Sequence, residues 1–348
     1  MRILALESSC DETALAIISG SGSDWVLEKD IVYSQIAIHQ KYGGVVPEVA
    51  ARKHAETIFP LLTETLGEEK LATIDYLAVT AGPGLVASLL LGVTAARSLA
   101  YAAAKPLLPV NHMEGHIYSN WLSNSELKNN DQKYFPSLAL VVSGGHTELV
   151  LMKNHGDYQL LGTTQDDAVG EAFDKVAKIL NLGYPGGPIV SKEALEGDDQ
   201  AYKLPRPMLN SGDYNFSFSG LKTAVLYTLE REKNISQAAV KNICASFQAA
   251  AVELLVKKTI KAAQEFQVKS IMIAGGVSAN QLLREELKKE STKISLPLFY
   301  PELKYTGDNA AMIAVAAYYG LQNKNKKILK GEEIFSAKPL SNWQIFLK

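Results

Sequence analysis

The sequence predicts an α/β protein in which one arrangement of strands and helices occurs twice. Apolar segments of strand length alternate with segments of helical spacing along the chain. Each half begins with two strands joined by a small polar turn, and each later has an apolar strand that ends in a Gly-rich turn and opens a helix. Because ligands of such folds bind at the carboxyl ends of the strands, we expect the site in the crevice between the halves.

Spacing of apolar residues predicts the elements of the first half in chain order. Residues 2–6 and 14–18 are expected to form two strands joined by the polar turn 7–13. The further elements predicted are a continuation of this sheet through Val32, Ile36 and Ile38, a helix over 45–66, a strand over 75–80 and a helix over 85–104. The last of these has the length of a membrane span, but Arg97 and many alanines favour a buried helix.

The second half repeats the pattern after a polar stretch, residues 123–134, that is expected to be a surface loop. The predicted elements are strands over 137–142, 148–152 and 270–274, with turns at 143–147 and 275–280. A lysine-rich run at 324–330 is interpreted as a solvated helix end rather than a nucleic-acid patch.

Composition limits the class of protein. A chain of 348 residues suits about two domains, and 47% hydrophobic residues exclude wholesale disorder. The net charge of −2 excludes a protein that binds nucleic acid through bulk positive charge alone. Two cysteines, Cys10 and Cys244, exclude a disulfide-dense scaffold and a Cys-rich zinc module. The short apolar run at residues 3–6 is no signal peptide, so we expect a soluble, cytoplasmic protein without membrane contact.

Two glycine-rich turns are candidates for holding a phosphate. No P-loop pattern occurs, and residues 82–87 lack the acid that a dinucleotide site needs about 20 residues later. The turns at 143–146 and 275–280 each place paired glycines after an apolar strand, which lets backbone N–H groups approach an anion. Either turn alone could be merely structural. A third rigid loop, 183–188, could lie beside a ring or sugar.

The segment His112-Met113-Glu114-Gly115-His116 predicts a metal site. Four helical residues turn by about 400°, so both imidazoles project from one face, while Glu114 lies roughly 200° from His112. Met113 stands where a zincin protease has its glutamate, which disfavours that chemistry. Two histidines on a helix surface or in a core are the plainer alternative.

Acidic residues supply the remaining candidates. Asp308 could be a third ligand, giving a set that suits Fe(II), Zn or Mn, or it could be an N-cap of the following helix. Asp11 and Glu12, in the first turn, could hold a cation or orient a nucleophile, or could serve the turn itself. Cys10 is a poor nucleophile beside these acids.

Ten motifs, in order, resemble the TsaD family, also called Gcp or YgjD. They are ESSCDET (7–13), GGVVPE (43–48), AGPG (81–84), HMEGH (112–116), VSGGHT (142–147), EAFDK (171–175), GYPGGP (183–188), FSFSGLKT (216–223), AGGVSAN (274–280) and TGDNAAM (306–312). This resemblance implies the actin, sugar kinase and Hsp70 (ASKHA) fold, with two duplicated RNase-H-like domains around a nucleotide cleft. We expect an N-terminal domain over 1–108, a second domain with the metal and adenylate site over 109–325, and a tail, 326–348, that returns to the first domain.

The resemblance also implies roles for particular residues. The family's metal ligands fall on His112, His116 and Asp308, and its acidic active-site turn falls on Asp11 and Glu12. The loop on the bound adenylate falls on Val141, Val142, Ser143, Gly144 and Gly145, and further substrate contacts on Asp174, Gly187 and Asn280. Ser191 stands where chiefly archaeal members have an acid, so no ribose contact is expected there and the bacterial-type pattern fits better.

The reaction implied is transfer of a threonylcarbamoyl group from threonylcarbamoyl-AMP to N6 of the adenosine beside the anticodon (position 37), in tRNAs that read codons starting with A. One divalent metal ion per subunit is expected, with Fe(2+) favoured and Zn(2+) possible. The implied partners are tRNA and two accessory subunits, a TsaB-type paralogue and a TsaE-type P-loop ATPase. The alternatives are a metallo-endopeptidase and a non-catalytic, ATP-binding actin-like scaffold.

Overall fold

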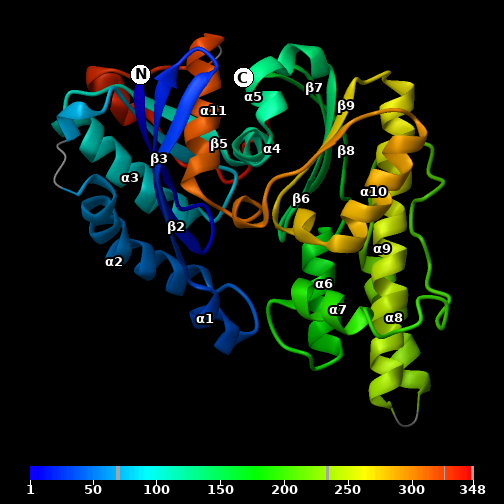
Figure 1. Ribbon diagram of the computed structural model, residues 1–348. Helices are drawn as coiled ribbons and strands as arrows, with labels where there is room; N and C mark the ends of the chain where they lie inside the picture. The colour runs from blue at the N-terminus through cyan, green and yellow to red at the C-terminus, as the bar shows by residue number, and fades with distance from the viewer. Residues whose placement is uncertain (68–70, 233–234, 325, 346–348) are drawn as a thin grey trace. The chain divides into compact units, whose positions relative to one another are not determined.

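The structure is a computed structural model that describes residues 1–67, 71–232, 235–324 and 326–345 (Figure 1). The chain forms two compact units. Unit 1 comprises Met1–Gln132, Asn154–Tyr158 and Pro301–Lys348, and unit 2 comprises Lys133–Lys153 and Gln159–Tyr300.

Unit 1 contains a mixed five-stranded sheet in the order β3-β2-β1-β4-β5. Its strands are β1 (Arg2–Glu7), β2 (Glu12–Ser21), β3 (Asp24–Ser34), β4 (Tyr76–Gly82) and β5 (Leu107–Asn111). The predicted hairpin is confirmed, because β1 and β2 pair antiparallel with Leu6 opposite Leu15. Parallel pairing of β1 with β4 and of β4 with β5 brings the turn after β1 and the ends of β4 and β5 to one edge.

Helices cover both faces of this sheet (Figure 1). The helices of unit 1 are α1 (Ile36–His39), α2 (Pro47–Leu66), α3 (Val86–Ala102), α4 (His112–Ser123), α5 (Ser125–Asn130) and α11 (Ala310–Gln322), of which α2, α3, α4 and α11 contact strands of the sheet. Side chains alternate along a strand, so Leu4 and Leu6 enter the core formed with α2 and α3. On the opposite face, α11 packs on β1 and β2 and beside α4. The helices predicted over 45–66 and 85–104 are confirmed as α2 and α3.

Unit 2 repeats the sheet of unit 1. Its strands are β6 (Ser137–Val142), β7 (Thr147–Asn154), β8 (Asp157–Thr163), β9 (Ser270–Ala274) and β10 (Leu298–Phe299). Read from β8, the order is β8-β7-β6-β9-β10, which is the third, second, first, fourth and fifth strand of the unit, as in unit 1. The pairing of β6 with β7 is antiparallel, and that with β9 is parallel. The predicted duplication is therefore confirmed in the topology.

The helices of unit 2 pack on one face of its sheet (Figure 1). They are α6 (Val169–Ile179), α7 (Gly186–Ala194), α8 (Ser219–Arg231), α9 (Gln237–Glu265) and α10 (Gln281–Lys293). Among the described residues, α9 is the one helix long and apolar enough to cross a membrane, with a mean hydropathy of 1.3 over its best window. Because 67% of that window is buried inside the protein, α9 is a core helix.

Three local predictions were wrong in whole or in part. Ile36 and Ile38 lie in α1 and not in the sheet. The polar stretch 123–134 forms α5 and a 3₁₀ turn rather than a loop, because the buried Leu127 and Tyr134 anchor it. The lysine-rich run is not simply solvated, since Lys326 is largely buried and pairs with Glu114.

The chain divides differently from the expected domains 1–108 and 109–325. β5 and α4 continue the sheet and packing of unit 1, so residues 109–132 belong there rather than to the second domain. Residues 301–324 also join unit 1, because α11 packs on β1. The tail lies against the same unit, where Leu329 pairs with Leu107 and Leu340 N–H donates to Ala81 O.

Candidate functional site

Helix α4 begins at the first histidine of the HMEGH segment. Asn111 is its N-cap, and the Asn111 side-chain oxygen accepts hydrogen bonds from the N–H groups of Met113 and Glu114 at 2.9 and 3.2 Å. His112 and His116 therefore stand one turn apart on one face, with ring centroids separated by 4.5 Å. Both rings are buried.

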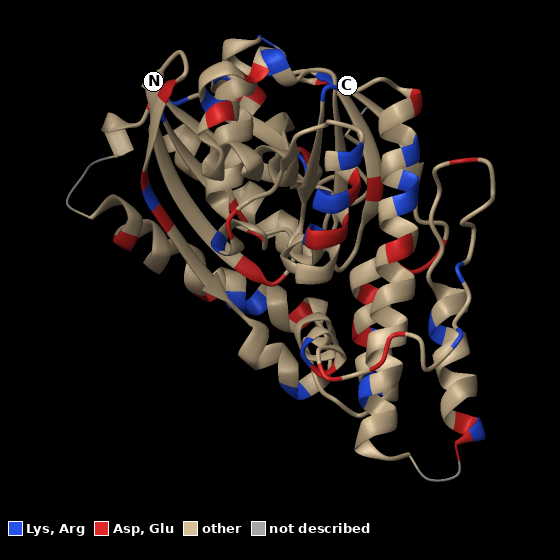
Figure 2. Ribbon diagram, turned by 45° about the vertical axis from the view of Figure 1, so that its right-hand side comes forward, with Lys and Arg blue, Asp and Glu red and all other residues tan. Residues whose placement is uncertain are grey.

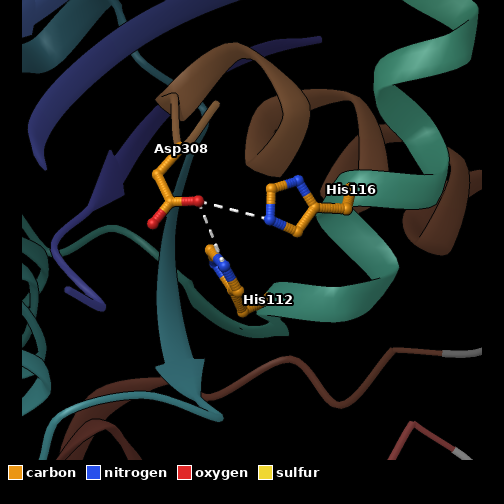
Figure 3. A group of neighbouring side chains, drawn as sticks. All are labelled: His112, His116 and Asp308. Carbon is orange, nitrogen blue, oxygen red and sulfur yellow. Dashed lines mark ion pairs between the residues drawn. The ribbon is translucent and has the colours of Figure 1, made fainter. Parts of the chain in front are cut away.

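Asp308 joins this pair from the segment that precedes α11. Its Oδ1 lies 3.4 Å from His112 Nε2 and 3.2 Å from His116 Nε2, and Figure 3 shows the carboxylate directed at both rings. The N-cap of α11 is Asn309, whose side chain accepts from Met312 N–H. Asp308 is therefore free of the capping role that the sequence left open.

The residues present fit a divalent metal ion. One ligand atom from each of His112, His116 and Asp308 lies within 4.8 Å of the others. Neither nitrogen of the buried His116 ring makes a hydrogen bond of good geometry, although such groups are normally satisfied, and Nε2 instead has the 3.2 Å contact with Asp308. Two imidazoles and one carboxylate suit Fe(II), Zn or Mn and leave coordination positions open.

The charges of these three groups are strongly coupled. Burial opposes the charged form of His112, but the carboxylates of Asp308 and Glu7 outweigh it and raise its pKa well above the usual value. Burial also opposes ionisation of Asp308, yet the neighbouring histidines lower its pKa. Burial and the charge of His112 lower the pKa of His116.

The acidic turn between β1 and β2 lies within electrostatic reach of Asp308. Burial, followed by the charges of Asp308 and Asp11, raises the pKa of Glu12 to about 9. Burial and Asp11 raise the pKa of the Cys10 thiol, which leaves it a poor nucleophile as expected. A bound cation reduces the repulsion between carboxylates that are crowded in this way.

Sequence reasoning missed Glu7. This residue ends the apolar strand β1, is fully buried, and its Oε2 lies 3.1 Å from His112 Nδ1. Ser9 N–H and the Thr80 hydroxyl donate to the same carboxylate. The signal for it is a single acid directly after the apolar run Ile3–Leu6, next to a polar turn that has further acids.

In unit 2, the turn Ser143–Gly145 is closed on itself and packed from two sides. Ser143 N–H donates to His146 O at 2.9 Å. A Cβ on Gly170 would lie 2.5 Å from Ser143 O, and a Cβ on Gly275 would lie 2.4 Å from Val142 O. The two predicted glycine turns are thus adjacent. A Cβ on Gly144 or Gly145 would meet no atom within 4 Å, so their backbone is open to a ligand.

The other substrate residues expected in unit 2 gather around the start of α7. Asp174 accepts from Gly186 N–H at 2.7 Å, and burial raises its pKa. Gly187 faces open space. The Asn280 side-chain amide donates to Ser191 Oγ and Gln248 Oε1 at 3.0 and 2.8 Å, so its side chain also has a structural task.

Some predicted residues can offer a ligand their backbone only. The side chains of Val141 and Val142 in β6 are fully buried. Asp166 accepts from the N–H groups of Phe218 and Ser219 at the start of α8, and Asp167 pairs with lysines, which lower its pKa against the effect of burial.

Comparison with known proteins gives one family. Residues 27–315 match the family model TsaD, described as tRNA N6-adenosine threonylcarbamoyltransferase. A protein of that name from Syntrophomonas wolfei is 51% identical over 93% of this chain and 93% of its own length. Another from Moorella thermoacetica is 49% identical over 91% of both chains.

Solved structures share the fold at low sequence identity. HypF from T. kodakarensis is similar with a TM-score of 0.61 and 15% identity, over 93% of this chain and 48% of HypF. The activator of the 2-hydroxyisocaproyl-CoA dehydratase from Clostridium difficile is similar with a TM-score of 0.50 and 13% identity, over 94% of this chain and 98% of the activator. These likenesses agree with the actin-like fold expected from the motifs.

Proposed function

The chain belongs to the TsaD family of tRNA N6-adenosine threonylcarbamoyltransferases, and from this premise we propose how its own residues carry out the transfer. It is a tRNA-modifying transferase. We propose threonylcarbamoyl-AMP as the donor, and as the acceptor N6 of the adenosine at position 37, beside the anticodon, in tRNAs that read codons starting with A.

His112, His116 and Asp308 hold one divalent metal ion in this proposal, with Fe(2+) favoured and Zn(2+) possible. The observation that carries it is the buried His116 ring, which makes no hydrogen bond of good geometry and is directed at the Asp308 carboxylate. A divalent ion held there would supply Lewis-acid stabilisation of negative charge on the donor.

Unit 2 binds the adenylate in this proposal. The open N–H groups of Gly144 and Gly145 suit a phosphate, because no side chain blocks their approach. Asp174, Gly187 and Asn280 contribute at the start of α7, and Val141 and Val142 contribute through their backbone.

The transfer requires positioning of the two substrates and stabilisation of charge, and it requires no covalent enzyme intermediate. A carbon–nitrogen bond forms between N6 and the carbamoyl carbon, while the bond from that carbon to the phosphate oxygen breaks. AMP leaves with the electron pair and is a good leaving group because the donor is a mixed anhydride. We assign to Asp11 and Glu12 the orientation of the amine, and to the Asp11 carboxylate the acceptance of its proton.

A metallo-endopeptidase is not favoured. Its mechanism needs a base beside the metal, but Glu114 lies on the other face of α4 and is bonded to Lys326 and Tyr158. A non-catalytic ATP-binding scaffold would have no use for two buried imidazoles directed at one carboxylate.

Accessory subunits of the TsaB and TsaE types are proposed partners, and a cytoplasmic location is proposed because the substrate is tRNA. The net charge of −2 offers no general attraction for a polyanion. Figure 2 shows acidic and basic residues interspersed, and lysines of α9 and α10 such as Lys257 and Lys293 pair with Glu253 and Glu290. Tight tRNA binding is therefore expected only in the complex.

The test is a reconstituted reaction with threonylcarbamoyl-AMP, unmodified tRNA, Fe(2+)-loaded protein and both accessory proteins, followed by nucleoside analysis. We expect threonylcarbamoyladenosine with the natural tRNA, and none with a tRNA that has guanosine at position 37. His112→Ala should lower the rate by a factor on the order of 10² or more. Full metal content together with the full rate in this variant would refute the ligand assignment.

A further inference from the structure

We propose that Glu7 is the positioning residue for the metal ligand His112. Its carboxylate accepts the proton on Nδ1 and thereby directs the lone pair of Nε2 toward the metal position. The inference rests on the proposed metal site and deepens it, since it names a group that acts through a ligand without binding the ion.

Position in the fold brings Glu7 to His112. β1 ends at Glu7, and the parallel strands β4 and β5 end beside it, with Thr80 near the end of β4 and Asn111 before α4. The first residue of α4 is His112, so its ring meets the end of β1. The Oε2–Nδ1 distance of 3.1 Å is that of a hydrogen bond.

Hydrogen bonding identifies Glu7 as an acceptor. Oε1 receives the backbone N–H of Ser9, and Oε2 receives the hydroxyl of Thr80. A fully buried carboxylate requires such donors, and His112 Nδ1–H completes the set. The carboxylate is fixed by two other elements, so it fixes the ring in turn.

The Ser9 hydroxyl is the competing partner, because Ser9 Oγ lies 3.2 Å from the same nitrogen. If Ser9 donated to Nδ1, the ring proton would sit on Nε2 and block metal binding. A bond to a carboxylate is charge-assisted and about twice as strong as a neutral one, so Glu7 decides the tautomer. Carboxylate–histidine pairs of this kind hold metal-binding rings in many sites.

The principal test measures the Zn²⁺ dissociation constant by chelator competition, with no substrate present. Glu7→Gln keeps the size of the side chain but can present its amide N–H to Nδ1, which favours the wrong tautomer. We expect Zn²⁺ binding weaker by about 10- to 100-fold. Ser9→Ala should change the constant by less than about threefold.

Glu114→Gln is the matched control, because Glu114 is a buried carboxylate on the ligand helix that contacts neither ligand. Its Zn²⁺ affinity should remain that of the unchanged protein. Unchanged affinity in Glu7→Gln would overturn the role of Glu7 while the metal site stands, provided that His112→Ala loses binding. Unchanged affinity in His112→Ala would overturn the proposed metal site and this inference with it.

A second measurement needs no substitution. The ¹⁵N chemical shifts of the His112 ring in the Zn²⁺-loaded protein distinguish a protonated nitrogen from one that binds the ion, with Asp308 engaged by the ion rather than by the ring. We expect the proton on Nδ1 and coordination through Nε2. A proton on Nε2 would overturn the proposal even if Glu7→Gln did not fold.

Discussion

Two buried carboxylates near the HMEGH segment serve opposite purposes. Glu7 contacts the ring of His112, whereas Glu114, in the middle of the segment, turns away from both histidines. Glu114 accepts a hydrogen bond from Tyr158 Oη at 3.0 Å and pairs with Lys326 of the tail. Glu7 therefore orients the ring of the metal ligand His112, and Glu114 attaches the tail to α4.

The Glu114–Lys326 pair gives a stability prediction. Glu114→Ala leaves the largely buried Lys326 ammonium without its carboxylate, and we expect a loss of about 3 kcal/mol or more in unfolding free energy. Urea unfolding of the metal-free protein measures it. Replacing both residues by apolar ones, Glu114→Leu with Lys326→Met, should recover much of the loss. If Glu114→Ala were as stable as the unchanged protein, Glu114 and Lys326 would not form a buried ion pair.

His54 of α2 gives a pH prediction. It is fully buried, with Nε2 at 3.0 Å from Cys10 O and Nδ1 at 2.8 Å from Thr13 Oγ1, and burial lowers its pKa. The unfolded chain takes up a proton near pH 6.5, but the folded state does so only at lower pH. This group therefore makes the unfolding free energy fall as the pH drops below about 6.5.

The check is the difference between the unchanged protein and His54→Gln, measured by urea unfolding from pH 8 to pH 5. The variant should lose less stability over this interval, because its amide does not titrate. Parallel stability curves would show that His54 takes up its proton equally in both states.

At the scale of elements, close glycine contacts set the shape of the loop proposed to bind the adenylate. Gly170, in the first turn of α6, lets the helix approach the backbone of Ser143. Gly170→Ala would place a methyl group 2.5 Å from Ser143 O, so the loop must move. We expect the KM for threonylcarbamoyl-AMP to rise about tenfold, since such overpacking typically costs about 1–3 kcal/mol.

Gly220→Ala in α8 is the control for this change. A Cβ there would meet only Pro207 Cγ, at 3.5 Å, and alanine is the better helix former by up to about 1 kcal/mol. This variant should be at least as stable as the unchanged protein and keep its KM. Equal KM values for both variants would mean that the position of the Ser143 loop does not govern donor binding.

Local patterns predicted most elements but not all. The spacing of apolar residues was sufficient for β1, β2, α2 and α3, whose apolar faces are regular. It failed for α5, because one buried residue, Leu127, decides the structure of a polar stretch. It failed again at Ile36, where the apolar residues follow the end of β3 and enter a helical turn.

The candidate site was predictable where one segment holds the chemistry. The spacing of His112 and His116 predicted the pair directly. Asp308 stayed open between a ligand and an N-cap, because nearly two hundred residues separate it from the helix, and the family motif favoured the ligand. Glu7 was missed because its role depends on the pairing of β1 with β4, which brings Thr80 beside it. Contacts between distant segments carry no local signal.

At the scale of the whole molecule, the two units have the same sheet but different loops. The turn after β1, helix α4 and the segment before α11 carry acids and histidines in unit 1, whereas the turn after β6 carries glycines in unit 2. All three proposed metal ligands belong to unit 1, and the proposed adenylate residues belong to unit 2. Duplication thus supplied two copies of one framework for two kinds of ligand.

This division predicts which part of the chain each ligand stabilises. A ligand that binds the folded state at 100 times its dissociation constant stabilises it by about 2.7 kcal/mol, and the gain applies to openings that break the site. We expect Zn²⁺ to slow hydrogen exchange in α4 and around Asp308 and to leave α6 and α7 unchanged. AMP should slow exchange in the Ser143–Gly145 turn and at the start of α7, with α4 unchanged.

His112→Ala should abolish the Zn²⁺ effect and keep the AMP effect, which separates the two sites within one protein. Protection of α6 and α7 by Zn²⁺ alone would contradict the assignment of all three metal ligands to unit 1.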